Sequence, residues 1–217
     1  MGAKSKIEWT DATWNPVRGC TRVSPGCENC YAERISARFS GLGKPFEGVA
    51  KMTPKGPRWT GRIRFVEEIL DEPLRWKRPR RIFVCSMSDL FHESVGFAEI
   101  KKVWDVMTNP KCYHHTFQVL TKRPKRMAEF LNWLGWWGDG DDQALFPHIW
   151  LGTSVEDQER ADERIPWLVH SSAAIRFLSC EPLLGSIRLK RCDLEDLHWV
   201  IVGGESGPSV RPMRLDW

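Results

Sequence analysis

Five short apolar runs, separated by helical patterns, constrain the fold of this chain more than any other sequence feature. Most of them end in polar residues or glycine. This alternation is typical of βα units whose strands lie parallel in one sheet. The expected strands cover residues 81–87, 116–121, 149–154, 174–181 and 199–207.

Helical periodicity fills the intervals between these runs. In residues 97–108, Ile100, Val103, Trp104 and Met107 recur on one helical face. Two further helices are expected, over residues 124–133 with Pro124 in the first turn, and from about Glu156 onward.

The predicted fold is therefore α/β, a single β/α domain over residues 1–217 whose parallel units form a partial or complete TIM-like barrel. A doubly wound open sheet is the alternative. The chain ends at Trp217 in what resembles the start of a helix. We therefore expect the natural protein to continue, and this chain to be truncated at its C-terminus.

Both folds place their chemistry at the carboxyl ends of the strands, where this sequence gathers polar groups. Gly203 and Gly204 let a ligand approach the backbone, and the carboxylates could bind its ammonium or hydroxyl groups. Turn formation is the alternative explanation for such residues. The predicted cofactor-binding residues are Ser86, Asp89, Lys122, Thr153, Ser154, Glu181, Gly203, Gly204 and Glu205.

Three cysteines lie close together in the stretch G-C-T-R-V-S-P-G-C-E-N-C-Y, namely Cys20, Cys27 and Cys30. Their thiols suit zinc or the irons of an iron–sulfur cluster. A closed zinc site needs a fourth ligand, and the next candidates, Cys85 and His92, are more than fifty residues away. We therefore expect a metal in a cysteine-rich loop over residues 18–32, and favour an iron–sulfur cluster over zinc.

Composition limits the other classes of function. No apolar run has the length of a membrane span, the N-terminus lacks a signal-peptide core, and the seven cysteines indicate a reduced cytoplasmic protein. A net charge of +4 permits a nucleic-acid or nucleotide partner without requiring one. Residues 41–60 are aperiodic and predict a long surface loop.

Several motifs occur in a fixed order along the chain. They are W-T-D-A-T-W-N-P-V-R-G-C, C-x2-C-Y-A-E, C-S-M-S-D-L-F-H, L-T-K-R-P, L-G-T-S-V-E, L-S-C-E-P-L-L-G and V-I-V-G-G-E-S-G. With them the chain resembles the phage-encoded "gp thirty-seven / gp sixty-eight" proteins, a domain of unknown function that is itself similar to radical S-adenosylmethionine (radical SAM) enzymes.

This resemblance implies a 4Fe–4S cluster on Cys20, Cys27 and Cys30 that binds S-adenosylmethionine and cleaves it on reduction. The first cysteine gap is six residues, whereas C-x3-C-x2-C is the commonest radical SAM pattern. Gly203-Gly204-Glu205 also lies on a late strand, whereas the comparable motif of those enzymes lies early.

Two other functions remain open. One is a metal-stabilised nucleic-acid-binding protein without radical chemistry, suggested by basic patches at residues 58–64, 77–81 and 122–126. The other is a hydrolase or nuclease that holds a divalent ion between Asp89, Glu156, Glu181 and Glu205.

Overall fold

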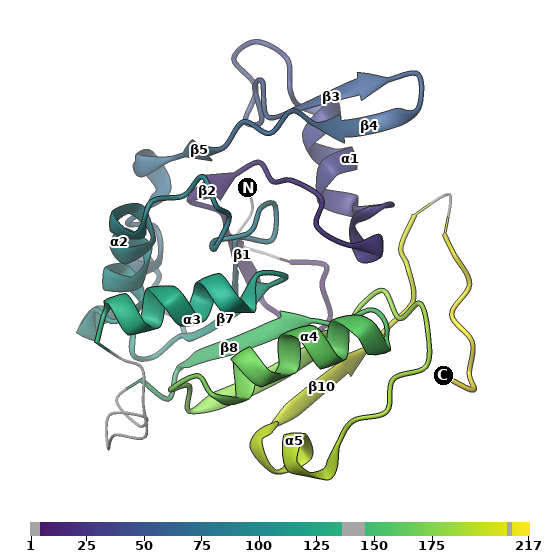
Figure 1. The fold of residues 1–217 in the computed structure, drawn as a ribbon. Helices are drawn as coiled ribbons and strands as arrows, with labels where there is room; N and C mark the ends of the chain where they lie inside the picture. The colour runs from purple at the N-terminus through teal and green to yellow at the C-terminus, as the bar shows by residue number, and fades with distance from the viewer. Residues whose placement is uncertain (1–4, 136–145, 208–209) are drawn as a thin grey trace. The chain divides into compact units, whose positions relative to one another are not determined.

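The computed structural model describes residues 5–135, 146–207 and 210–217 (Figure 1). Its strands are β1 (Ala12–Trp14), β2 (Val17–Arg18), β3 (Ala50–Thr53), β4 (Gly56–Trp59), β5 (Arg64–Phe65), β6 (Arg81–Val84), β7 (Thr116–Thr121), β8 (Ile149–Ser154), β9 (Ile175–Cys180) and β10 (Trp199–Val202). The α-helices are α1 (Tyr31–Arg38), α2 (Phe97–Met107), α3 (Pro124–Trp133), α4 (Gln158–Val169) and α5 (Arg191–Asp196). Short 3-10 helices are η1 (Pro25–Cys27), η2 (Glu67–Ile69), η3 (Pro73–Arg75) and η4 (Pro110–Cys112).

The central sheet has six strands in the order β1-β6-β7-β8-β9-β10. The chain also divides into two compact units, and the boundary falls within β7. Unit 1 comprises Met1–Val23 and Cys30–Val119, and unit 2 comprises Ser24–Asn29 and Leu120–Trp217.

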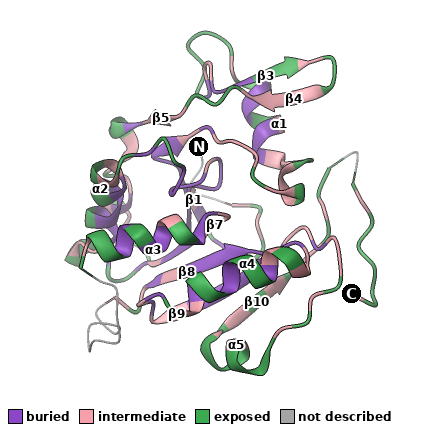
Figure 2. Ribbon diagram, viewed as in Figure 1, coloured by how far each residue is buried: buried purple, intermediate pink, exposed green. Residues whose placement is uncertain are grey.

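In unit 1, β6 pairs in parallel with β1 on one side and β7 on the other, so that Ile82 lies opposite Ala12 and Phe117. These strands are buried, which explains their continuous apolar sequence. Helix α2 buries the predicted face of Ile100, Val103, Trp104 and Met107. Figure 2 shows buried and exposed residues alternating along this helix.

In unit 2, β9 pairs in parallel with both β8 and β10. Helix α4 packs against β8 and against α3. Pro124 occupies the first turn of α3, as its fixed φ favours, and the Asp157 side chain caps α4 by accepting the Arg160 N–H at 2.9 Å. The carboxyl ends of these strands therefore form one edge of a regular parallel sheet.

The predicted α/β class and parallel strands are confirmed. Strand β1 was not predicted, because Ala12–Trp14 is too short to show a period. It lies at one end of the strand order and β10 at the other, and the described residues contain no pairing between the two. The structure thus shows a parallel sheet without showing a closed barrel.

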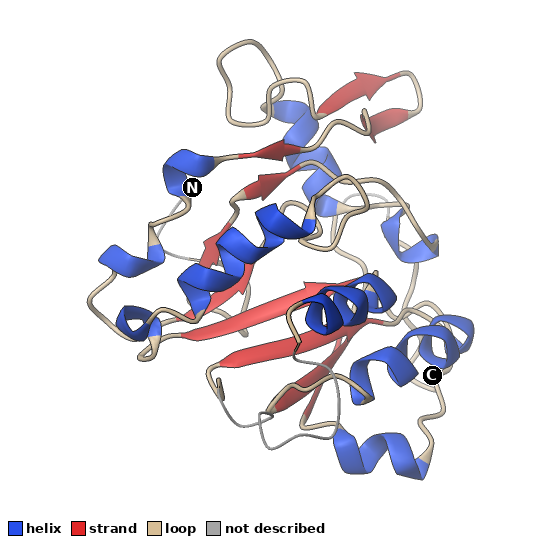
Figure 3. Ribbon diagram, turned by 60° about the vertical axis from the view of Figure 1, so that its left-hand side comes forward, coloured by secondary structure: helices blue, strands red, loops and turns tan. Residues whose placement is uncertain are grey.

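The prediction of a loop over residues 41–60 needs correction. Strands β3 and β4 form an antiparallel hairpin there, with Ala50 opposite Trp59 and Thr53 opposite Gly56. The hairpin packs on α1 (Figure 3). It escaped prediction because most of its side chains are at least partly exposed, so the sequence carries no apolar alternation.

Candidate functional site

Two of the three clustered cysteines, Cys20 and Cys30, belong to unit 1. Cys20 follows β2, and Cys30 immediately precedes α1 as its N-cap residue. Gly19 forms a parallel bridge with Ser88 and has a φ of +93°. A Cβ at this position would lie 2.3 Å from the Arg62 carbonyl oxygen, so only glycine fits here.

A buried carboxylate fixes this part of the loop. Glu33, on the first turn of α1, accepts hydrogen bonds from Arg22 Nε at 3.1 Å and from the Trp59 backbone N–H at 2.6 Å. A second guanidinium nitrogen of Arg22 also contacts it. Glu33 therefore joins the loop between the cysteines to α1 and β4.

The segment after β6 provides a second set of contacts within unit 1. Tyr31 donates to the Ser86 carbonyl at 2.7 Å, and Ser88 donates to the Val17 carbonyl at 2.8 Å. Asn15 accepts from the Ser86 hydroxyl at 3.1 Å and the Met87 N–H at 2.9 Å. The C-S-M-S-D-L-F-H motif thus supports both cysteines of this unit.

His92 completes this support. Its Nδ1 accepts the Ser94 N–H at 3.1 Å, so the neutral ring carries its proton on Nε2. Nε2 lies 2.9 Å from the Thr21 hydroxyl, to which it donates. His92, weighed from sequence as a distant metal ligand, is thereby placed beside the residue that follows Cys20.

The third cysteine, Cys27, lies in the segment Ser24–Asn29 of unit 2. The Gly26 N–H donates to Glu156 Oε1 at 3.2 Å, and Arg164 Nη1 donates to Glu156 Oε2 at 3.1 Å. Burial alone would raise the pKa of Glu156, but Arg164, the Ser24 hydroxyl and Lys122 together hold it below its ordinary value. Glu156 is therefore an ionised group that binds the Cys27 segment.

Glu205 binds the same segment from the end of β10. Asn29 Nδ2 donates to Glu205 Oε2 at 2.8 Å, and the Arg211 N–H donates to that oxygen at 2.8 Å. Against the effect of burial, these bonds and the Arg211 guanidinium lower the pKa of Glu205 to about 2. Arg211 also donates to the Pro25 carbonyl at 2.9 Å and contacts Glu28.

The other predicted residues of unit 2 lie where the sequence placed them, at or just after the ends of strands. Thr153 donates to the Thr121 carbonyl at 2.9 Å, and Ser179 donates to Glu181 at 3.3 Å. A Cβ on Gly203 would approach Glu181 Oε1 to 2.7 Å, so Gly203 makes room for that carboxylate. The strand ends of unit 2 therefore gather Lys122, Thr153, Ser154, Glu181, Gly203, Gly204 and Glu205.

Ser86 and Asp89 belong to unit 1 instead. Both are buried, and Asp89 Oδ1 accepts the Phe91 N–H at 3.0 Å. Their side chains shape the turn after β6. Binding of a cofactor by any residue of the predicted set stays a prediction.

The clustered cysteines differ from the three buried ones. Cys20, Cys27 and Cys30 are partly exposed and form no disulfide. Burial raises the pKa of Cys85 to about 12, and that of Cys112 and Cys180 to about 11, so these three stay protonated thiols. Three cysteine thiols are suitable donors for a thiophilic metal. Among the described residues, however, no three His, Cys, Asp or Glu side chains are gathered as a ligand set.

Sequence reasoning missed the groups that hold the loop. Glu33, Asn15 and Arg211 find their partners in segments distant in the chain or through the backbone, which no local spacing reveals. One signal was available for Glu33, since a carboxylate three residues after Cys30 falls in the first turn of a helix.

None of the helices in the described part of the chain combines the length and apolar character that a bilayer span requires. No match to the chain was found among curated proteins or among solved structures. Residues 4–217 match the family described as "Protein of unknown function (DUF5131)". Because the match covers nearly the whole chain, the protein belongs to the DUF5131 family.

Proposed function

We propose that this DUF5131 protein is a cytoplasmic iron–sulfur protein of radical SAM type, which binds a 4Fe–4S cluster through Cys20, Cys27 and Cys30. It would cleave S-adenosylmethionine and act on a nucleic-acid or nucleotide substrate. The resemblance to phage-encoded radical SAM-like proteins supports this proposal, as does the parallel α/β sheet, which is compatible with a partial barrel.

The contrast among the cysteines carries the proposal. Three partly exposed cysteines occur within eleven residues, while the three buried cysteines, Cys85, Cys112 and Cys180, have raised pKa values. Three thiolates satisfy three irons of a 4Fe–4S cluster and leave the fourth iron for another ligand. Cys30 also precedes the N-terminus of α1, whose dipole stabilises negative charge.

The protein's own residues have two tasks in this proposal. Glu33 holds the loop through the Arg22 side chain, and Glu156 holds it through the Gly26 N–H, which orients the thiols. The strand-end residues, among them Lys122 and Glu181, offer charged groups for the carboxylate and ammonium of S-adenosylmethionine. A reduced 4Fe–4S cluster, when bound, supplies the electron that cleaves this cofactor.

Metal analysis of anaerobically purified protein tests the proposal. We expect about four irons and four sulfides per chain and a broad absorption band near 400 nm. Cys20→Ala, Cys27→Ala and Cys30→Ala should each lose the cluster. Cys192→Ala is the matched control, because Cys192 is exposed and outside the loop, and it should keep the full iron content.

A second measurement separates cluster binding from catalysis. Reduced wild-type protein given S-adenosylmethionine should release 5′-deoxyadenosine, and Cys27→Ala should not. One tightly bound zinc without iron would contradict the proposal and favour a metal-stabilised nucleic-acid-binding protein.

A further inference from the structure

Residues 38–64 of unit 1 concentrate positive charge. They contain seven Lys and Arg residues and a single acidic residue, Glu47. The net charge of the whole chain is only +4, so the rest of the chain is net negative. The cations are Arg38, Lys44, Lys51, Lys55, Arg58, Arg62 and Arg64. We call residues 38–64 the basic segment.

The cations of the basic segment have no carboxylate partners, in contrast to cations elsewhere. Arg81, Lys101 and Arg164 each form an ion pair with a carboxylate. Among the described residues, no ion pair involves any of the seven cations. Glu47, the one acid, instead accepts the Gly43 N–H at 2.8 Å. The positive charge is thus left without internal compensation.

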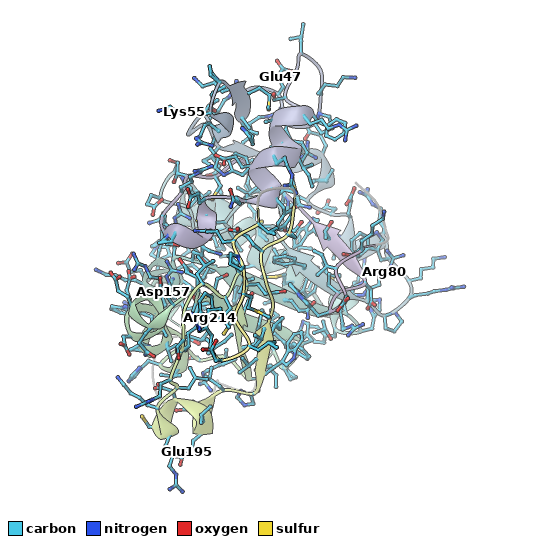
Figure 4. The ribbon with its side chains drawn as sticks, turned by 90° about the vertical axis from the view of Figure 1, so that its right-hand side faces the viewer. Glu47, Lys55, Arg80, Asp157, Glu195 and Arg214 are labelled. Atoms are coloured by element: carbon cyan, nitrogen blue, oxygen red, sulfur yellow. The ribbon has the colours of Figure 1, made fainter. Side chains whose placement is uncertain are left out.

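These cations project from a packed platform. Phe46 and Val49 pack with Ala32 of α1 and with Met87, and Trp59 covers this cluster. Arg18 also donates to the Pro45 carbonyl at 2.7 Å. Figure 4 labels Lys55, at the hairpin turn, toward the same end of unit 1 as Glu47. Cations fixed on a folded frame lose less entropy on binding than cations on a disordered tail.

Apolar side chains are exposed between the cations. Leu42 is 91% exposed and Met52 is 66% exposed, and Phe39 presents an accessible ring with the Arg38 guanidinium 5.5 Å from its centre. Free phosphate would use the cations alone. A nucleic acid would use both kinds of group, because its phosphates need cations and its bases stack on aromatic or apolar surfaces.

We propose that the basic segment is a docking surface for nucleic acid, with Lys44, Lys51 and Lys55 on the phosphate backbone and Phe39 available to a base. The surface shares unit 1 with Cys20 and Cys30, and Glu33 links them because it bonds both Trp59 and Arg22. Docking does not depend on the proposed cluster chemistry.

Fluorescence anisotropy of the full chain tests this proposal, with a labelled 20-nucleotide single strand and a 20-base-pair duplex as probes. We expect binding to at least one probe, with affinity that falls steeply as salt rises. The triple variant Lys44→Ala/Lys51→Ala/Lys55→Ala should bind at least about tenfold more weakly, and its salt slope should fall by about 2 to 3.

A matched variant controls for net charge. Arg188→Ala/Lys190→Ala/Arg191→Ala removes three exposed cations of unit 2 and should retain wild-type affinity within about twofold. Equal weakening in both triple variants would overturn the proposal. So would undiminished binding by the first triple variant, if its circular dichroism matches that of the wild type.

Two further measurements test whether the surface binds a membrane instead of nucleic acid, and whether nucleic-acid binding depends on the proposed iron–sulfur cluster. Vesicles with one fifth phosphatidylserine should compete poorly, and binding to vesicles without binding to either nucleic acid would overturn the proposal in favour of a membrane. Cys27→Ala should bind nucleic acid as the wild type does. A protein without iron that still binds would contradict only the proposed cluster function, and a cluster protein that binds neither probe would contradict only the docking surface.

Discussion

The two parts of the cysteine-rich loop are held by the same device in different settings. In unit 1, Glu33 bonds the loop residue Arg22 and accepts the Trp59 N–H of β4. In unit 2, Glu156 accepts the Gly26 N–H of the loop and pairs with Arg164 of α4. The settings differ in the arginine. The side chain of Arg22 is 28% exposed, whereas that of Arg164 is only 3% exposed.

This difference predicts which carboxylate, Glu33 or Glu156, contributes more to the free energy of unfolding. An arginine at the surface regains water when its partner is removed, whereas a buried arginine is left as an uncompensated charge. Glu33 and Glu156 therefore make similar hydrogen bonds, but their removal should lower the free energy of unfolding by different amounts.

Removal of the Glu156 charge should have the largest effect. Glu156→Gln leaves Arg164 buried without a counter-ion and should lower the free energy of unfolding by about 3–5 kcal/mol. Urea unfolding of the purified chain measures this loss. The double variant Glu156→Leu/Arg164→Leu should recover part of it, because no buried charge remains. A loss below about 1 kcal/mol in the single variant would break the comparison.

The second-largest effect is expected at Glu205 of unit 2, whose contribution to the free energy of unfolding should be lost in acid. The pKa of Glu205 is lowered to about 2, from an ordinary value of 4.5. Its stabilisation is therefore complete above pH 4.5 and is lost as the pH falls toward 2, because the unfolded chain binds the proton first. At pH 7, Glu205→Gln should lower the free energy of unfolding by about 2 kcal/mol.

Urea unfolding at pH 7, 5, 4 and 3 tests this sign. The difference between wild type and Glu205→Gln should shrink below pH 4.5, while it stays constant between pH 5 and 7. A difference that grows in acid would show that the Arg211 contacts stabilise the protonated carboxyl instead.

The smallest of the three effects is expected in unit 1. Glu33→Gln keeps an oxygen for the Trp59 N–H, and Arg22 can turn toward water, so we expect a loss of about 1–2 kcal/mol in the free energy of unfolding. Glu8→Gln, an exposed carboxylate of the same unit, is the control and should change it by less than about 0.5 kcal/mol. If Glu33→Gln cost as much as Glu156→Gln, exposure of the arginine would not be the deciding factor.

Strand and helix positions from β6 onward could be predicted because buried segments have continuous or periodic apolar sequences. The apolar runs that became β7, β8 and β9 are buried on both faces, and the periodic face of α2 is buried as expected. Strand β1 has three residues, and the β3–β4 hairpin is partly exposed, so neither has such a sequence.

For the candidate site, the positions of residues at strand ends could be predicted, but most of their hydrogen-bond partners could not. Parallel strands fix where their ends lie, so the positions of Thr153, Glu181 and Gly203 followed from the strands alone. The partners of Glu205 did not, because Asn29 and Arg211 meet it through loops whose paths depend on the folded chain. Whether these groups bind a cofactor depends on chemistry that the strand pattern does not encode.

Gly19 has a consequence for how this sequence can vary. Gly43 has a φ of +70° with open space around it, so asparagine or aspartate could replace it at modest cost. Gly19 has both a positive φ and the Arg62 carbonyl in the way. A homologue with a side chain at position 19 would therefore need a different backbone path at the position of Arg62. We therefore expect the residue before Cys20 and the backbone around Arg62 in the basic segment to change together in evolution.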